Sequence, residues 1–172
     1  MTTQNALNVG LSGSTGTGSF VGATSPTITT ANIIGVADAS SASAGSVGQV
    51  ISSSVTSGSG VSLTSNTATN VTSILLTAGD WDVSGNVTTI CSTASDPFTA
   101  VWTSLTNATL PDRSLRNGHL IVQTSSSQQN GMEAPYLRVN VNTTTTVYLS
   151  AQCNFSGGTT TACGNIFARR VR

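Results

Sequence analysis

The sequence contains no lysine and few charged side chains of any kind. Six arginines balance six acidic residues in a chain of 172, so the formal net charge is zero. Proteins that bind nucleic acids usually carry a basic patch or stripe, and this composition therefore argues against a nucleic acid as partner. The surface must be made polar by serine, threonine, asparagine and glutamine instead.

Long apolar segments are also missing. No apolar run reaches the roughly 18 to 20 residues that a membrane-spanning helix needs. The first ten residues, MTTQNALNVG, contain neither the basic region nor the apolar region of a secretory signal. We therefore expect a soluble protein that carries no visible secretion signal and does not insert into a membrane.

Strong helix formers are scarce, whereas threonine, valine and isoleucine are abundant, which predicts an all-β protein. From residue 46 onward, apolar residues alternate with polar ones, as in DWDVSGNV, where Trp81, Val83 and Val87 share one face. This pattern predicts an antiparallel β-sandwich, most simply a jelly roll of eight or nine strands, over residues 46–172. The expected strands are 48–55, 61–64, 70–76, 80–90, 98–105, 119–124, 135–141, 145–155 and 162–169.

Residues 1–45 are rich in small residues and contain few large apolar side chains, so we expect an extended segment that precedes the sandwich. Its stretch GSTGTGSF is too poor a match for a nucleotide-binding loop. A P-loop needs a lysine, and the dinucleotide motif needs a different glycine spacing before a helix. We interpret the segment as an attachment region, with the candidate residues Gly13, Gly16, Gly18, Phe20 and Pro26.

No residue pattern predicts a metal or a cofactor. The six residues DWDVSG match the start of a calcium-binding EF-hand loop, but the twelfth position is Cys91 instead of glutamate, and the alternation favours a strand. The three cysteines fit no zinc motif. Cys153 and Cys163 flank a turn-like stretch, which leaves two readings open: a disulfide across a hairpin, or buried small side chains.

Catalytic residue types are equally scarce. The single histidine, His119, stands where a strand is expected to begin, and the acids Asp96, Asp112 and Glu133 fall in predicted loops. A glycosidase would need two such carboxyl groups held close together, which no spacing here requires. We predict that the protein is not an enzyme. The C-terminal arginines in ARRVR favour either an acidic partner surface or simple solubility.

Several stretches resemble virion proteins of tailed bacteriophages. The stretch GSTGTGSFVGATSPTITTANIIG resembles a segment of tail-fibre and related proteins. Three others, AGSVGQVISSSV, VTSILLTAGDWDVSGNV and the C-terminal TTTVYLSAQCNFSGG with ACGNIFARRVR, resemble the domain that often follows it; residues 91–132 match least. The resemblance implies a trimeric jelly-roll knob, similar in architecture to tumour-necrosis-factor-type trimers.

The resemblance also implies a location and a role. We expect a homotrimeric virion protein, made in the cytoplasm of the bacterial host, that joins other virion proteins through its N-terminal segment. Its loops are expected to contact the host surface, with a surface glycan as the candidate receptor. The alternatives are a capsid decoration or head-fibre protein, and a glycan-degrading tailspike. The candidate contact residues are Asp96, Trp102, Asp112, Arg113, Arg116, Glu133 and Tyr136, with Trp102, Tyr136 or Trp81 as stacking platforms. Core packing is the alternative for both tryptophans, and the alternation with Val83 favours it for Trp81.

Overall fold

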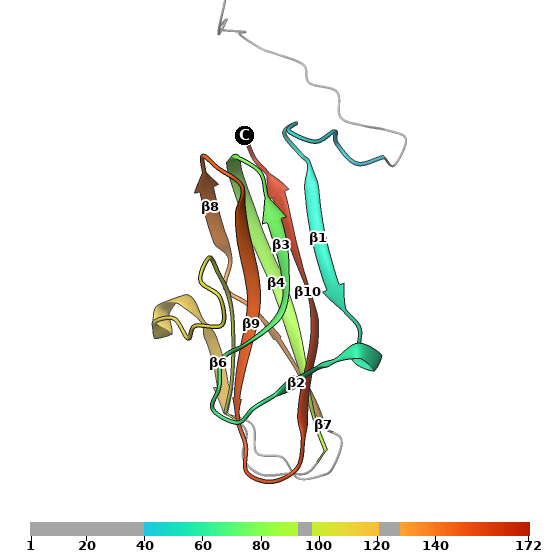
Figure 1. Cartoon of the computed structure of the whole chain (residues 1–172), viewed down its shortest axis with the longest axis vertical. Helices are drawn as coiled ribbons and strands as arrows, with labels where there is room; N and C mark the ends of the chain where they lie inside the picture. Colours follow the sequence, from blue (N-terminus) through green and yellow to red (C-terminus); the bar gives the residue numbers. More distant parts are fainter. Residues whose placement is uncertain (1–39, 93–97, 121–127) are drawn as a thin grey trace, which may run out of the picture. The chain divides into compact units, whose positions relative to one another are not determined.

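The computed structural model describes residues 40–92, 98–120 and 128–172, which form ten strands and two short 3-10 helices (Figure 1). The strands are β1 (Val50–Val55), β2 (Val61–Leu63), β3 (Thr69–Leu76), β4 (Gly79–Cys91), β5 (Phe98–Ser104), β6 (Asn117–Leu120), β7 (Gln128–Glu133), β8 (Leu137–Val141), β9 (Thr145–Asn154) and β10 (Thr160–Arg170). The helices are η1 (Ser57–Ser59) and η2 (Arg113–Leu115). Within the described ranges, no helix has the length and apolar character to cross a membrane.

The strands form two antiparallel sheets. Sheet A has the order β1-β10-β4-β7, and sheet B has the order β3-β9-β5-β6. In sheet A, β1 and β2 pair with successive stretches of β10, and β7 and β8 pair with successive stretches of β4. The ten strands therefore fill eight positions, and the chain passes repeatedly from one sheet to the other. This is the strand order of a jelly roll, so the predicted fold is confirmed.

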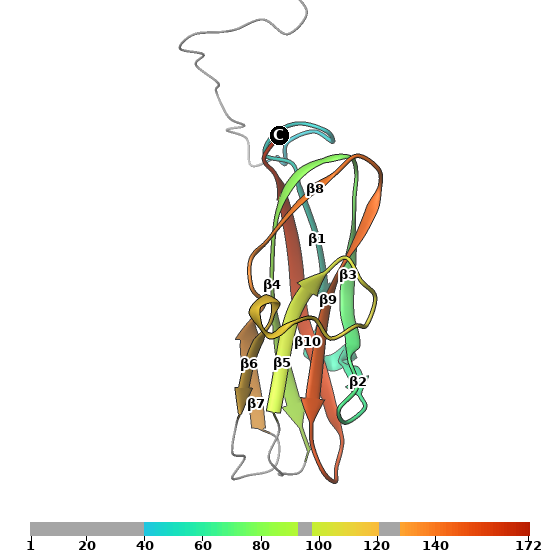
Figure 2. The same cartoon turned by 90° about the vertical axis from the view of Figure 1, so that its left-hand side faces the viewer.

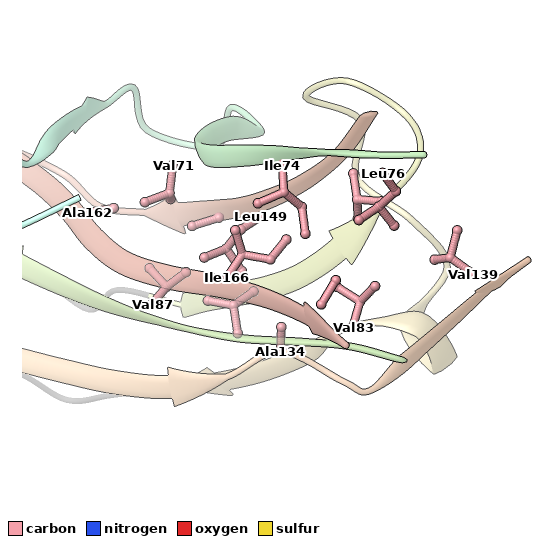
Figure 3. Packing of buried hydrophobic residues seen from close by; sticks show 14 of the residues in the cluster. Val71, Ile74, Leu76, Val83, Val87, Ala134, Val139, Leu149, Ala162 and Ile166 are labelled. Carbon is pink, nitrogen blue, oxygen red and sulfur yellow. The ribbon is translucent and has the colours of Figure 1, made fainter. Parts of the chain in front are cut away.

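Alternating side chains explain why the two sheets pack together. Along β4, Trp81, Val83 and Val87 are fully buried, while Asp82, Ser84 and Asn86 lie on the outer face of sheet A. β9 repeats the pattern with Val147 and Leu149. The inward side chains of both sheets meet in one core, as Figure 3 shows for Val71, Ile74 and Leu149 of sheet B and for Val83, Val87 and Ile166 of sheet A.

One strand was missed by the sequence analysis. Residues 128–133 (QQNGME) were expected to be a loop, but they form β7, which pairs with residues 86–91 of β4. Met132 is the single large apolar residue of this stretch and packs against the core, and one such residue gives no alternation from which a strand could be predicted. β6 ends at Leu120, and residues 121–124 of the strand expected there lie outside the described residues.

The start of the sandwich is a turn before β1. Ser46 N donates to Ser43 O at 3.0 Å, and Gly48 N donates to Arg170 O at 2.9 Å, which ties this turn to the last residues of β10. Of the expected attachment segment, residues 1–39 lie outside the described residues, including Gly13, Gly16, Gly18, Phe20 and Pro26. The boundary expected at residues 45/46 falls inside the turn and stays a prediction.

The C-terminal arginines hold this end of the sandwich together. Arg170 is 6% exposed, donates to Ala78 O at 2.8 Å and to Thr77 Oγ1 at 2.6 Å, and stacks 4.4 Å from the centre of the Trp81 ring. Arg172 donates to Asp80 Oδ2 at 2.8 Å. Neither interpretation of ARRVR applies to the buried Arg170, whereas the side chain of Arg172 is 71% exposed and leaves both open.

Candidate functional site

The candidate site is built on the long connection between β5 and β6, which folds back over the outer face of sheet B (Figure 2). Asn70 of β3 anchors the connection, because its Oδ1 accepts hydrogen bonds from Ala108 N at 3.0 Å and from Ser150 Oγ at 2.7 Å. Ser150 lies on β9, so a single asparagine side chain joins the connection to two strands of the sheet.

Helix η2 begins in this connection because Asp112 caps it. The Asp112 carboxylate accepts hydrogen bonds from Ser114 N at 2.9 Å and from Ser114 Oγ at 2.8 Å, as aspartate at the first position of a turn commonly does. Pro111, whose ring fixes its φ angle, directly precedes Asp112. The side chains of Arg113 and Leu115 on the capped turn are exposed, whereas Arg116 is half-buried. We call residues 111–118 together with Tyr136 the η2 surface.

A first hollow, of about 240 Å³, lies on one side of η2. Its walls are mostly apolar and include Leu105, Leu115 and Tyr136. These three side chains are 49%, 57% and 62% exposed, which is unusual for large apolar groups gathered in one place. Tyr136 Oη donates a hydrogen bond to Asp82, which fixes the ring and raises the pKa of the phenol. The hollow is therefore an exposed apolar surface with a held aromatic ring.

A second hollow, of about 620 Å³, lies on the other side of η2. It is lined by Phe98, Arg113, Arg116, Asn117 and Gly118. Two guanidinium groups thus border one space, and none of its described lining residues carries a carboxylate. Among the described residues, the ion pairs involve other arginines, Arg138 and Arg172, which both bind Asp80.

Four of the seven predicted contact residues lie together on the η2 surface: Asp112, Arg113, Arg116 and Tyr136. Glu133 is exposed at the end of β7, where its backbone oxygen accepts a hydrogen bond from Asn117 Nδ2 at 2.5 Å. Asp96 lies outside the described residues. The structure thus joins one predicted loop to a tyrosine from the link between β7 and β8.

The prediction that Trp102 is a stacking platform is wrong, because its side chain is 0% exposed and offers no surface to a ligand. Its neighbour Val101 pairs with Ala151 in the core, so Trp102 faces outward from sheet B, opposite Ser150. The connection that Asn70 ties to Ser150 covers it. Its Nε1 is buried without an acceptor among the described residues. Trp81 is also fully buried, in the core, where its Nε1 donates to Thr77 O at 3.0 Å.

The exposed leucines were missed by the sequence analysis. Leu105, Leu110 and Leu115 are 49%, 38% and 57% exposed, and all three belong to the connection between β5 and β6. The signal was present in the stretch LTNATLPDRSL, where three leucines stand among turn-forming residues that build no strand. Apolar side chains in such a loop indicate either a cover for the sheet or a contact surface, and these three remain open to solvent.

The environment of Asp112 does not suit glycosidase chemistry. Hydrogen bonds from the backbone and side chain of Ser114 hold the pKa of Asp112 below its ordinary value. A glycosidase general acid needs the opposite shift, so Asp112 does not fit that role. Among residues 40–92, 98–120 and 128–172, no group of three or more histidine, cysteine or acidic side chains could hold a metal.

The cysteines form no disulfide in the structure. All three are free thiols, and Cys153 points into the core from β9 whereas Cys163 lies on the outer face of sheet A. β9 and β10 belong to different sheets and do not pair as a hairpin, so the two cysteines do not face each other as a disulfide would require. The alternative reading, buried small side chains, holds for Cys91 and Cys153, which are 2% and 0% exposed.

Comparisons with known proteins identify no family. No protein-family model matches the sequence, and no curated protein matches it. Two solved structures resemble the fold: one of infectious bursal disease virus, Gx strain, and one of the VP2 subviral particle of the same virus. Each has a TM-score of 0.43 and 12% identity over 82% of this chain. This chain spans 38% and 37% of those chains, and a likeness at this level carries no conclusion about function.

Proposed function

We propose that the protein is a non-enzymatic structural protein of a bacteriophage virion, a trimeric knob that attaches the particle to the host surface. The η2 surface carries this proposal. It combines the exposed Tyr136 and Leu115 with two arginines, and the connection that carries the leucine and the arginines is anchored to the jelly roll. Aromatic side chains and arginine are enriched where proteins bind partners, and loops on a rigid scaffold often carry recognition. The resemblance of several stretches to phage fibre proteins supports the virion location.

The outer face of sheet A supports the trimeric part of the proposal. Phe167 and Val50 are 46% and 48% exposed at neighbouring positions on β10 and β1. Phe167 separates two shallow hollows of about 190 Å³ and 400 Å³ whose other walls are mainly small polar residues, including Ser52, Ser54 and Asn165. A flat face with one protruding aromatic ring and a hollow on each side can fit the same face of other copies around an axis.

Light scattering tests the assembly. We expect the purified protein to have three times the chain mass of 17.3 kDa. Phe167→Asp places a charge in the contact and is expected to reduce the mass to that of one chain. The matched control is Leu75→Asp, because Leu75 is 59% exposed on β3 of the other sheet. A single-chain mass for the unmodified protein would contradict the trimer.

Binding of fluorescently labelled protein to cells of the bacterial host tests the attachment role. Tyr136→Ser and Leu115→Ser are expected to weaken binding at least tenfold, which corresponds to about 1.4 kcal/mol at a contact. Tyr136→Phe keeps the ring and is expected to retain most of the binding, whereas Leu75→Ser is the control on another exposed leucine. Unchanged binding by both η2 variants, with unchanged melting temperatures, would show that the η2 surface does not contact the host.

A further inference from the structure

The arginine-lined hollow beside η2 contains a donor without an acceptor. Arg116 is partly buried, and its Nη1 is fully covered yet has no hydrogen-bond partner among the described residues. A buried guanidinium nitrogen that donates no hydrogen bond is costly, because it has lost water and gained nothing in return. The described residues supply no acceptor at this position, and a bound group could supply one.

Arg113 borders the same space, so the hollow combines two positive charges. Asp112, the nearest acid in the sequence, directs its carboxylate to Ser114, to which it is bound at 2.9 and 2.8 Å. No carboxylate is among the described residues that line the hollow. The whole chain has no net charge, so the two arginines concentrate positive charge at the hollow, which Asp112 offsets in part through its electrostatic attraction to Arg116.

An apolar wall completes the hollow. The ring of Phe98 lies close against β6, where a Cβ at Gly118 would stand 2.9 Å from Phe98 Cζ. Glycine at position 118 thus leaves room for the ring to occupy this place. An aromatic ring offers a flat apolar surface to the C–H face of a sugar, while a guanidinium group offers two parallel N–H donors that match a carboxylate.

We propose that this hollow binds the carboxylate of an acidic saccharide, with Arg113 and Arg116 holding the anionic group and Phe98 contacting the sugar ring. The volume of about 620 Å³ lies within the range of small-molecule sites. The proposal rests on the proposed attachment function and gives its receptor a chemical class, a glycan that contains uronic acid residues. Phosphate groups could use the same two arginines, and the test separates the two anions.

Isothermal titration calorimetry of the full chain with a hexuronate tetrasaccharide tests the proposal. The reference ligand is the same tetrasaccharide with its carboxyl groups reduced to alcohols. We expect binding of the acidic form, at least tenfold weaker binding of the reduced form, and weakening as the salt concentration rises. Equal affinity for the two forms, or binding of neither, would overturn the proposal. Stronger binding of glycerol phosphate than of the hexuronate would reassign the site to a phosphorylated polymer and also overturn it.

Variants locate the binding. Arg113→Gln and Arg116→Gln are each expected to reduce the affinity for the hexuronate at least tenfold, in proteins whose cooperative thermal unfolding shows that they are folded. Arg169→Gln is the matched control, because Arg169 is an exposed arginine on β10 of the other sheet. An equal loss in all three variants would indicate nonspecific charge attraction and contradict the assignment.

The two proposals can fail separately. Protein that binds host cells but ignores the hexuronate would refute the acidic-saccharide site and leave the attachment function standing. Protein that binds the hexuronate through Arg113 and Arg116 but does not bind host cells would refute the attachment function and leave the site standing.

Discussion

Gly164 is the position where one added methyl group should disturb the sandwich most. It lies on β10 opposite Val87 of β4, and a Cβ built there would stand 2.1 Å from Asn86 O and 3.0 Å from Val87 Cα. Both atoms belong to the backbone, so no side chain can rotate away. Ordinary contact would require the two strands to separate by about 1 Å, in the middle of a pairing that runs from Thr160 to Arg170.

The expected cost of Gly164→Ala is about 3 kcal/mol, at the upper end for overpacking because a backbone has to move. For a protein of this size, that corresponds to a decrease of about 6–12 °C in the melting temperature. The matched control is Gly131→Ala on β7, where a Cβ would meet only Thr88 Oγ1 at 3.5 Å. It is expected to be neutral or to stabilise by up to about 1 kcal/mol.

Thermal unfolding followed by circular dichroism measures the difference, with all proteins at one concentration because assembly makes the melting temperature depend on it. Melting of Gly164→Ala within about 2 °C of Gly131→Ala would refute the close approach of β10 to β4.

Three other predictions concern burial and charge. Trp102→Ala is expected to lower the free energy of unfolding, measured in urea, by about 3–5 kcal/mol because Trp102 is fully buried. A decrease below about 0.5 kcal/mol would place Trp102 at the surface instead. Hydrogen bonds from Arg138 lower the pKa of Asp80. The stability that Asp80 contributes is therefore present above the ordinary aspartate pKa and is lost as the pH falls through the lowered pKa. Asp80→Asn should reduce the loss of stability at acid pH, and an unchanged dependence of stability on pH would contradict this. Burial raises the pKa of the Cys153 thiol. A thiol reagent should therefore label the half-buried Cys163 before Cys153 in the folded protein. Equal labelling rates for the two cysteines would argue against the burial of Cys153.

The fold was predictable where one face of a strand is apolar and the other is polar. The alternation around Trp81, Val83 and Val87 predicted β4 together with its buried face, because a half-buried strand imposes a period of two. Alternation could not predict β7, because its mostly polar residues 128–133 show no such pattern and pair with the backbone of β4. It also could not orient β5, which carries buried residues on both faces.

The site was predictable in its parts but not in its assembly. Asp112, Arg113 and Arg116 stand in a charged loop, and the sequence predicted a contact role for them on that ground. Their place beside Tyr136 depends on how the connection folds back over sheet B, and residues 20 or more apart carry no local signal of such a meeting. The burial of Trp102 has the same cause, because its cover comes from the following loop and not from the core.

The partners of the C-terminal arginines were beyond prediction for a related reason. Arg170 reaches the turn between β3 and β4 and the ring of Trp81, about 90 residues earlier in the chain. Only the antiparallel pairing of β10 with β4 brings these groups together. A short basic stretch at a chain end reads from sequence as a solvated tail, whereas two of its arginines fasten one end of the sandwich.

Electron cryomicroscopy of the intact virion tests the central claim most directly, because it locates the protein, its copies and its exposed surfaces in one map. The account predicts three copies around an axis, in contact through the outer faces of sheet A, with every η2 surface open to solvent. A map in which another virion protein covers the η2 surface, or in which the copies stand singly, would contradict it.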